Sequence, residues 1–239
     1  MSVEFTYGTT QYIKWTTPGG VVGLTTKTIS TWFYYPTAQD GWSLFNIYDG
    51  TGTDLDEYTA IYSPSPDTLK LRFDSHWSTT NGAWKTTSNV LTAGAWHHIC
   101  LTYDGGATTN NPIMYINGVS KAMTRLTAPA GTYRTDTNAD LYASGPFTGF
   151  AMAGNVADLR VYSSILSAAQ VAALYNDGPF TPNYDTNLVF HAPLTNCTAL
   201  SGSAYDGYTL TSSQKLIDRI GCAEGTPSGS PLGSNTNPT

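Results

Sequence analysis

Two tryptophans lie in a polar stretch of the sequence, where their flat side chains could contact a sugar ring. Trp77 and Trp84 stand within residues 74–85, among Ser, Thr, Asn, His and Lys side chains. An indole face can stack on a sugar, while neighbouring hydroxyl and amide groups hydrogen-bond to its hydroxyls. We therefore take Trp77 and Trp84 as candidate glycan-binding residues. The alternative is that both are core residues, because packed sheets readily bury tryptophan.

The carboxylates of the chain are poorly placed for acid–base catalysis. Its glutamates, Glu4, Glu57 and Glu224, are far apart in sequence. Asp54 and Asp56 could share one face of a strand, but they follow a Gly- and Thr-rich segment that is typical of a solvated loop. Hydrolysis of a glycosidic bond normally needs two carboxyl groups that flank the bond. The sequence therefore predicts that the protein is not an enzyme.

Histidine and cysteine offer no catalytic arrangement either. His97 and His98 are adjacent in one predicted strand, so they point to opposite faces and cannot bind one metal ion together. Cys100 lies in the same apolar run and is expected to be a small buried hydrophobe. No serine stands in the G-x-S-x-G turn that exposes a nucleophile.

Composition excludes two classes of partner. Only 12% of the 239 residues are charged, and the net charge is −6 with eleven basic residues that form no cluster. Binding to nucleic acid or to an anionic membrane surface needs a basic stripe, so we expect neither. No apolar run approaches the ~18 residues of a membrane-spanning helix, so we expect no membrane insertion.

The local patterns indicate an antiparallel β-protein. Residues 94–106 form an aromatic and β-branched run that ends in a Gly-Gly pair, and residues 112–118 form an apolar run that ends in Asn117-Gly118. Asn-Gly is the strongest short signal for a tight hairpin turn. Earlier strands are expected at residues 5–7, 12–15, 29–35, 42–48, 58–62 and 69–73.

One short helix is predicted near residues 167–176. Ser167 is a good N-cap, and Gln170 three residues later can complete a capping box. Alanines and spaced apolar residues follow, and Gly178-Pro179 ends the helix.

Two segments, taken together, carry a family resemblance. The first, within residues 94–118, reads W-H-H-I-C-L-T-Y-D-G and then M-Y-I-N-G; the second, residues 154–167, reads G-N-V-A-D-L-R-V-Y-S-S-I-L-S. In this order they resemble the laminin-G-like branch of the concanavalin A-like lectin/glucanase jelly rolls, over roughly residues 1–178. The resemblance implies an all-β fold, an antiparallel β-sandwich (jelly roll), and a lectin-like role.

The C-terminal part departs from the family order. Residues 187–194 resemble the family's first strand, yet they lie late in this chain. Three readings stay open: the strand completes its own sandwich in a permuted domain, it completes the sandwich of a neighbouring subunit, or it begins a second repeat. We divide the chain into a jelly-roll domain, 1–183, and a C-terminal extension, 184–239.

The end of the extension is a low-complexity tail. Residues 225–239 are almost entirely Gly, Ser, Pro, Thr and Asn, a composition that cannot bury apolar surface by itself. We expect such a tail to be held against another chain, so the protein is predicted to form an assembly, with a homo-oligomer as the first expectation. Cys197 and Cys222 flank a loop in the extension, and whether they pair is left open.

The resemblance also implies a structural calcium ion. In many relatives the Asp of the G-x-i-D strand helps to hold calcium with backbone carbonyls, and Asp158 falls on that position. Asp206, in the loop after the strand 187–194, is a second candidate ligand. Asp158 could equally accept hydrogen bonds from a nearby backbone. Glycosidases of this fold carry acidic residues at alternate positions of one strand, E-x-D-x-E, and that pattern is missing here.

These observations favour a non-enzymatic surface protein. The first residues, 1–6, lack the basic and apolar segments of a signal peptide. We therefore predict a virion surface subunit, of a bacteriophage, that serves as a decoration protein, fibre or adhesin and contacts the capsid or a cell-surface glycan. The first alternative is an extracellular carbohydrate-binding module of a larger secreted protein. A glycoside hydrolase is the second, and it would need an acidic pair that the sequence does not contain.

Overall fold

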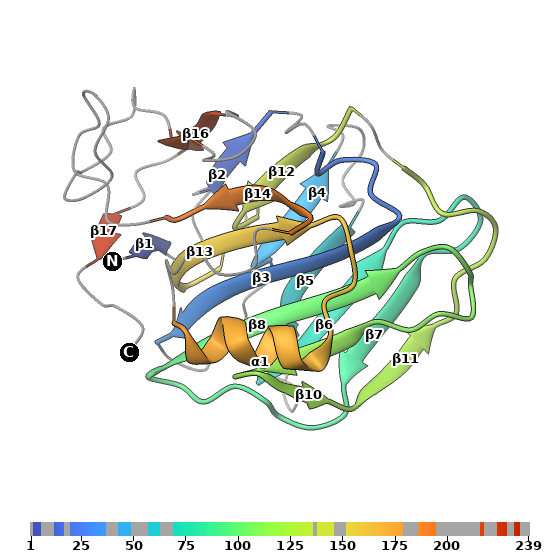
Figure 1. Cartoon of the computed structure of the whole chain (residues 1–239), viewed down its shortest axis with the longest axis horizontal. Helices are drawn as coiled ribbons and strands as arrows, with labels where there is room; N and C mark the ends of the chain where they lie inside the picture. The colour runs from blue at the N-terminus through green and yellow to red at the C-terminus, as the bar shows by residue number, and fades with distance from the viewer. Residues whose placement is uncertain are drawn as a thin grey trace.

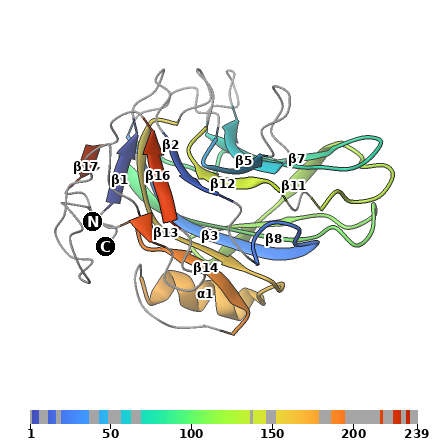
Figure 2. The ribbon, with the colours of Figure 1, turned by 90° about the horizontal axis from the view of Figure 1, so that it is seen from above.

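The computed structural model is a sandwich of two antiparallel β-sheets, with one helix against the outer face of one sheet (Figure 1, Figure 2). The structure describes residues 2–5, 12–16, 20–36, 43–48, 57–62, 69–135, 138–145, 152–178, 186–194, 216–217, 224–228 and 232–234. Short strands joined by turns build both layers, so the predicted antiparallel all-β sandwich is confirmed.

Sheet A is the layer that carries the helix. Among the described residues its strands follow the order β10-β9-β8-β3-β13-β1-β17, and β14 also pairs with β13. The longest ladder joins β3 and β8 over ten residue pairs, from Thr26 opposite Asp104 to Tyr35 opposite Ala95. The strands are β1 (Ser2–Phe5), β3 (Thr26–Tyr35), β8 (Ala95–Asp104), β9 (Ile113–Ile116), β10 (Val119–Lys121), β13 (Gly154–Tyr162), β14 (Leu188–Ala192) and β17 (Leu232–Ser234).

Sheet B is the opposite layer. Its described strands follow the order β11-β7-β6-β5-β4-β12-β2-β16-β15. They are β2 (Tyr12–Trp15), β4 (Phe45–Tyr48), β5 (Glu57–Tyr62), β6 (Lys70–Ser75), β7 (Gly82–Thr86), β11 (Met123–Thr127), β12 (Asp140–Ala143), β15 (Leu216–Ile217) and β16 (Glu224–Ser228). Strands β7, β10, β11 and β12 lie outside the strands expected from the sequence.

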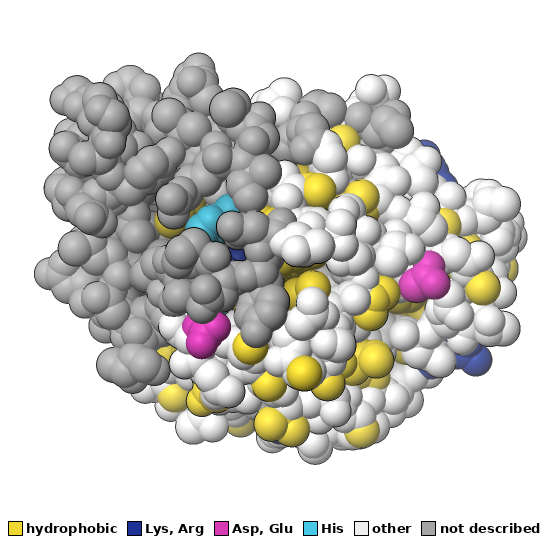
Figure 3. Space-filling model, in the orientation of Figure 1, with side chains coloured by type: hydrophobic (Ala, Val, Ile, Leu, Met, Phe, Trp, Pro, Cys, Tyr) yellow, Lys and Arg dark blue, Asp and Glu magenta, His cyan; other side chains and the backbone are white. Residues whose placement is uncertain are grey.

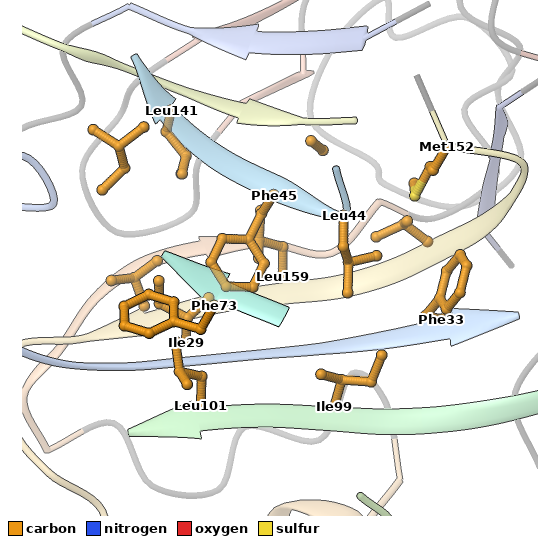
Figure 4. Close-up of a cluster of buried hydrophobic side chains, with 14 of the residues drawn as sticks. Ile29, Phe33, Leu44, Phe45, Phe73, Ile99, Leu101, Leu141, Met152 and Leu159 are labelled. Atoms are coloured by element: carbon orange, nitrogen blue, oxygen red, sulfur yellow. The ribbon is translucent and has the colours of Figure 1, made fainter. Parts of the chain in front are cut away.

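The main core fills the space between the two sheets (Figure 4). Strand β6 shows the reason: Leu71 and Phe73 are fully buried, while Lys70 and Arg72, which alternate with them along the strand, are only half-buried. Side chains alternate across a strand, so each sheet presents one apolar face to the other. Phe33 and Leu101 from sheet A meet Phe45 and Phe73 from sheet B in this layer.

A second, smaller core lies beneath helix α1 (Ala168–Asn176). The predicted capping box is present: the Gln170 backbone N–H donates to Ser167 Oγ at 3.3 Å, and the Ser167 N–H donates to Gln170 Oε1 at 2.9 Å. The helix covers the outer face of sheet A. Its cluster comprises Cys100, Tyr115, Tyr162, Leu166, Val171, Leu174 and Leu188.

The C-terminal strands pair within their own chain. Strand β14 lies inside the predicted range 187–194 and runs antiparallel to β13, with Leu159 opposite Ala192. Strand β16 pairs with β2, and β17 pairs with β1. In this structure, residues 188–192 therefore lie in the sandwich of their own chain. The proposed boundary between residues 183 and 184 lies outside the described residues, as do Cys197 and Cys222.

Candidate functional site

Trp77 is a core residue. Only 4% of its surface is exposed, its indole N–H donates to Ser75 Oγ at 3.0 Å, and the ring of Tyr133 packs edge-on against it at 5.5 Å. Its backbone forms an isolated bridge with Tyr133. Trp77 therefore presents no free face to a sugar. The prediction that its indole is exposed for glycan stacking is corrected.

Trp84 is also buried, but it borders a surface cleft. It is 1% exposed and stacks on Phe73 with ring centres 6.0 Å apart. Its indole N–H donates to Asn111 Oδ1 at 2.9 Å. The sequence suggested an exposed stacking residue, whereas Trp84 lies on the face of β7 that points into the sandwich. As for Trp77, the structure leaves Trp84 no exposed face on which a sugar could stack, and that prediction is corrected. Trp84 nevertheless remains part of a candidate site.

Asp158 lies in a buried charged cluster on β13. A β-bulge gives it a left-handed backbone, φ 54°, and its N–H donates to the Pro193 carbonyl at 2.8 Å. Arg160 Nε donates to Oδ1 at 3.1 Å, Arg160 Nη2 lies 2.9 Å from Oδ2, and His191 Nε2 lies 2.6 Å from Oδ1. Burial alone would raise the pKa of Asp158, but the hydrogen bond from His191 and the Arg160 charge outweigh it and lower that pKa.

This cluster bears on the predicted calcium site. Both Asp158 carboxylate oxygens already accept from cationic or N–H groups, so an ion bound there would have to displace Arg160 or His191. The donor set at Asp158 therefore does not fit calcium. Within the described part of the chain, no group of three or more His, Cys, Asp or Glu side chains could hold a metal ion. Asp206 lies outside the described residues, and calcium stays a prediction.

His97, His98 and Cys100 are buried side chains of β8. His98 is buried under α1, where its Nε2 hydrogen-bonds with Ser30 Oγ at 2.8 Å and its ring contacts Trp32 and Tyr175. Burial lowers the pKa of His98 to about 4, against a smaller raising effect of Asp158. Burial also raises the pKa of the Cys100 thiol, which keeps it protonated and unreactive. None of these groups faces a cleft.

A cleft opens where the two sheets end side by side, and we call it the edge cleft. Its volume is about 650 Å³. Strand β10 is the last strand of sheet A and β11 is the last strand of sheet B, and the chain passes from one to the other at Ala122. The cleft is lined by Trp84, Asn111, Pro112, Ile113, Ser120, Lys121, Ala122, Met123 and Arg125.

A tight turn positions the first wall of the edge cleft. Asn117 and Gly118 have φ of 52° and 75°, the left-handed values of the hairpin turn that the Asn-Gly pair predicted. The turn sets Lys121 opposite Met114, whose side chain is fully buried in the main core. Directly opposed residues share a face, so Lys121 lies on the side of sheet A that faces sheet B.

The second wall is β11. Arg125 lies opposite Trp84 across the β11–β7 pair and therefore shares the inner face of sheet B at its edge. Arg125 is exposed and Lys121 is half-buried. The two cations thus stand at the mouth of the interlayer space, one on each sheet, above the buried indole of Trp84.

The described walls of the edge cleft are fixed, and their charged groups are cationic. Its floor is rigid, because stacking on Phe73 and the hydrogen bond to Asn111 fix Trp84. Ser120 and Ile113 also border the cleft, but Ser120 pairs with Tyr115, which packs beneath the helix, and Ile113 shares the face of Tyr115, so both lie on the outer face of sheet A. None of the described lining residues is Asp, Glu, His or Cys, so the described walls supply no carboxylate pair for glycosidic hydrolysis and no thiol nucleophile.

The sequence argument did not select Asn111, Lys121 or Arg125. The usable signal was the Asn-Gly turn, which fixes a two-residue hairpin and so gives the face of Lys121. The pairing of β11 with β7 has no comparable local signal, so the face of Arg125 could not be found in advance.

The fold is a β-sandwich with a cleft at the sheet edges, and the family model agrees with this fold. Residues 7–172, more than half of the chain, match the model of the concanavalin A-like lectin/glucanases superfamily. The chain belongs to this family, as the two motif segments indicated. A search of curated proteins gives no match.

Solved structures share the fold at low sequence identity. A candidate carbohydrate-binding protein from Bacteroides ovatus is 16% identical, with a TM-score of 0.65, and the match covers 100% of this chain and 61% of that one. A heptameric SAP-like pentraxin from Limulus polyphemus is 15% identical, with a TM-score of 0.54 and coverages of 73% and 81%. The sialidase CBM40 of Ruminococcus gnavus, solved with α2,3-sialyllactose, is 12% identical, with a TM-score of 0.50 and coverages of 73% and 98%.

These similarities establish the fold. The chain spans about three fifths of the Bacteroides ovatus protein, 61% of its length. Among the described helices, none is long and apolar enough to cross a membrane.

Proposed function

We propose that this chain is a non-enzymatic carbohydrate-binding domain and that the edge cleft is its sugar site. The observation that carries the proposal is the make-up of the cleft: the Asn111 amide and the two cationic groups of Lys121 and Arg125 surround a fixed, buried indole, and no carboxylate lies on the described walls. Sugar sites combine apolar contact with a few well-placed polar groups. The Bacteroides ovatus and Ruminococcus gnavus proteins support it as carbohydrate-binding examples of the same fold.

The polar groups of the cleft are placed to hydrogen-bond a sugar. Asn111 uses its Oδ1 to accept from Trp84, and its Nδ2 lies a long 3.5 Å from the Thr109 carbonyl. That amide therefore retains donor capacity toward a ligand. Asn111 is exposed, so its side chain is reachable from solvent.

A hydrolase role has less support. Three described aspartates are held in ion pairs outside the cleft: Asp74 pairs with Arg72, Asp140 with Lys14, and Asp158 with Arg160. We therefore expect sugar binding without turnover.

Isothermal titration calorimetry of the full chain, after a glycan array has chosen a ligand, tests the proposal. We expect Asn111→Ala to weaken binding about tenfold, because one hydrogen-bond partner is lost and the floor residue Trp84 is released. Thr124→Ala is the matched control, since Thr124 is exposed on β11 but lies opposite Lys85, on the other face from Arg125. An array without any bound glycan, or equal losses in both variants, would overturn it.

The setting that we propose for this contact is a virion surface, where the chain would be a decoration, fibre or adhesin subunit. A low-charge surface rich in Thr, Ser and Asn supports this setting. Co-sedimentation of the purified chain with capsids tests it. Sugar binding without any capsid association would favour the alternative, a carbohydrate-binding module within a larger extracellular protein, which the 61% coverage of the Bacteroides ovatus protein suits.

A further inference from the structure

We infer that the ligand of the edge cleft carries a carboxylate, so that its substrate class is acidic oligosaccharides; this inference rests on the function proposed above. The observation behind it is the placement of two cations, Lys121 and Arg125, at the mouth of the cleft.

The charge of the edge cleft is opposite to that of the chain. The protein has seventeen acidic and eleven basic residues, a net charge of −6. The charged lining residues are nevertheless both cations. Within the described part of the chain neither Lys121 nor Arg125 has an ion pair or a side-chain hydrogen bond, whereas Lys14, Arg72 and Arg160 each pair with an aspartate.

The geometry suits one anionic group on a sugar. Lys121 and Arg125 come from the edges of different sheets, on either side of the crossing at Ala122, and both stand on faces turned toward the interlayer space. A guanidinium forms two parallel hydrogen bonds to a carboxylate, and an ammonium adds a point charge. The exposed side chain of Asn111 lies in the same cleft and can hydrogen-bond to the ring that bears the carboxylate.

A small acidic sugar fits better than a polyanion. Nucleic acid would need a longer basic stripe, and the net charge of −6 on the whole chain would repel it. A sulfated sugar shares the anionic chemistry, because a guanidinium also pairs with tetrahedral oxyanions, and the sulfated probe in the test distinguishes it from a carboxylate.

The test is calorimetry of the full chain with a uronic acid trisaccharide and with the same trisaccharide after reduction of its carboxyl groups to alcohols. The two probes have the same size and ring chemistry, so they differ in charge alone. We expect the acidic probe to bind at least tenfold tighter, and high ionic strength to remove most of this advantage. A sulfated trisaccharide and a short single-stranded DNA serve as further arms.

Three variants complete the test. Arg125→Met and Lys121→Met should each abolish most of the preference for the acidic probe while leaving weak binding of the neutral probe. Lys85→Met removes the same charge from the opposite face of sheet B and should change nothing, because Lys85 does not line the cleft. Unchanged melting temperatures establish that the variants fold.

The outcomes separate this inference from the proposed function. Equal affinity for both probes, or a preference that survives both cleft variants, overturns the acidic-ligand inference while sugar binding at the site stands. Tighter binding of the sulfated probe or of DNA also overturns it, in favour of that ligand. No binding of any sugar overturns the proposed function as well.

Discussion

Asp158 has a left-handed backbone inside a strand, and this conformation directs its carboxylate to two side chains. The bulge at Ala157–Arg160 turns the residue out of regular alternation, so that it meets Arg160 on its own strand and His191 on β14. All three side chains are at most 8% exposed. A buried carboxylate with such partners is stable only while both sides of the pair are present.

Asp158→Asn should therefore be strongly destabilising. The change leaves the Arg160 guanidinium buried without its counter-charge, and breaking such a pair costs about 3–5 kcal/mol of the free energy of unfolding. Urea denaturation at neutral pH measures the loss. The double variant Asp158→Asn/Arg160→Met is the control, and it should recover part of the stability because no lone buried charge remains. A single variant as stable as the wild type would contradict the role of this cluster.

The same variant tests calcium. If the resemblance is right about a calcium ion at Asp158, EDTA should lower the melting temperature of the wild type, and this shift should vanish in Asp158→Asn. The partners of the carboxylate lead us to expect no shift in either protein. Differential scanning calorimetry with and without the chelator decides between the two.

His98 should make stability depend on pH. Its pKa falls from 6.5 in the unfolded chain to about 4 in the folded one, chiefly because of burial. Between these values the unfolded state binds more protons, so stability is complete above about pH 6.5 and falls as the pH is lowered toward 4. The difference in pKa corresponds to about 3 kcal/mol.

Urea denaturation at pH 7.5 and at pH 5, for the wild type and for His98→Gln, checks this expectation. The variant should lose much of the slope. His97 adds a smaller slope of the same sign in both proteins, because burial lowers its pKa too. A wild type and a variant with the same pH dependence would refute the assignment to His98.

The sequence predicted the inward or outward orientation of individual side chains least well. Residues 74–85 look solvated because polar residues surround both tryptophans, yet Trp77 and Trp84 point inward. A strand with one buried face needs only alternate apolar residues, and the large surface of one indole fills the interior between polar neighbours. Exposure at these positions depends on the partner strands β6 and β11, which local sequence does not specify.

At the scale of elements, β14 links the two sheets. It extends sheet A beside β13, and its Phe190 reaches across to pack edge-on against Trp15 of sheet B, with ring centres 5.2 Å apart. Phe190 and Trp15 are both fully buried. A strand far along the chain therefore contributes to the centre of the fold.

Phe190→Ala should lower the free energy of unfolding by about 3–5 kcal/mol, the range for a large side chain removed from a packed core. Val189→Ala on the same strand is the matched control. Val189 is only half-buried, so its loss should cost clearly less. Chemical denaturation of both variants makes the comparison, and equal losses would show that Phe190 has no special place in the core.

Deletion of residues 184–239 is a stronger form of the same test. The truncated chain lacks β14 and leaves one edge of β13 and the ring of Trp15 uncovered. We expect it to unfold or to melt at a much lower temperature. A truncated protein with an unchanged melting temperature would mean that residues 1–183 form a complete domain.

Elements with strong local signals could be predicted, and others could not. The capping box of Ser167 and Gln170 and the turn at Asn117-Gly118 fix their own backbone geometry, so the helix and the hairpin follow from a few residues. Strands β10 and β11 are short and largely exposed, so they lack the apolar alternation that marks a strand. The walls of the edge cleft are these two strands, which is why the cleft itself was missed.

At the scale of the whole molecule, the edge cleft and the C-terminal strands lie at opposite ends of the sheets (Figure 1). Sheet A runs from β10 to β17 and sheet B from β11 to β15. On the face shown in Figure 3, charged side chains are sparse among the described residues. Ligand contact at one end and contact with another copy at the other end are therefore sterically compatible.

Deletion of residues 225–239 should abolish self-association and leave sugar affinity unchanged. The described end strand of sheet A, β17, consists of Leu, Gly and Ser, and an uncharged edge can pair its free backbone groups with a second copy. Removing the tail exposes β1 and β2 instead, which carry Glu4 and Lys14, and charges on an edge strand oppose such pairing. Light scattering of the full and shortened chains gives the molar masses, and calorimetry with the same sugar gives both affinities. A full chain that is monomeric would contradict the assembly; a shortened chain that loses sugar binding would show that the two ends are not independent.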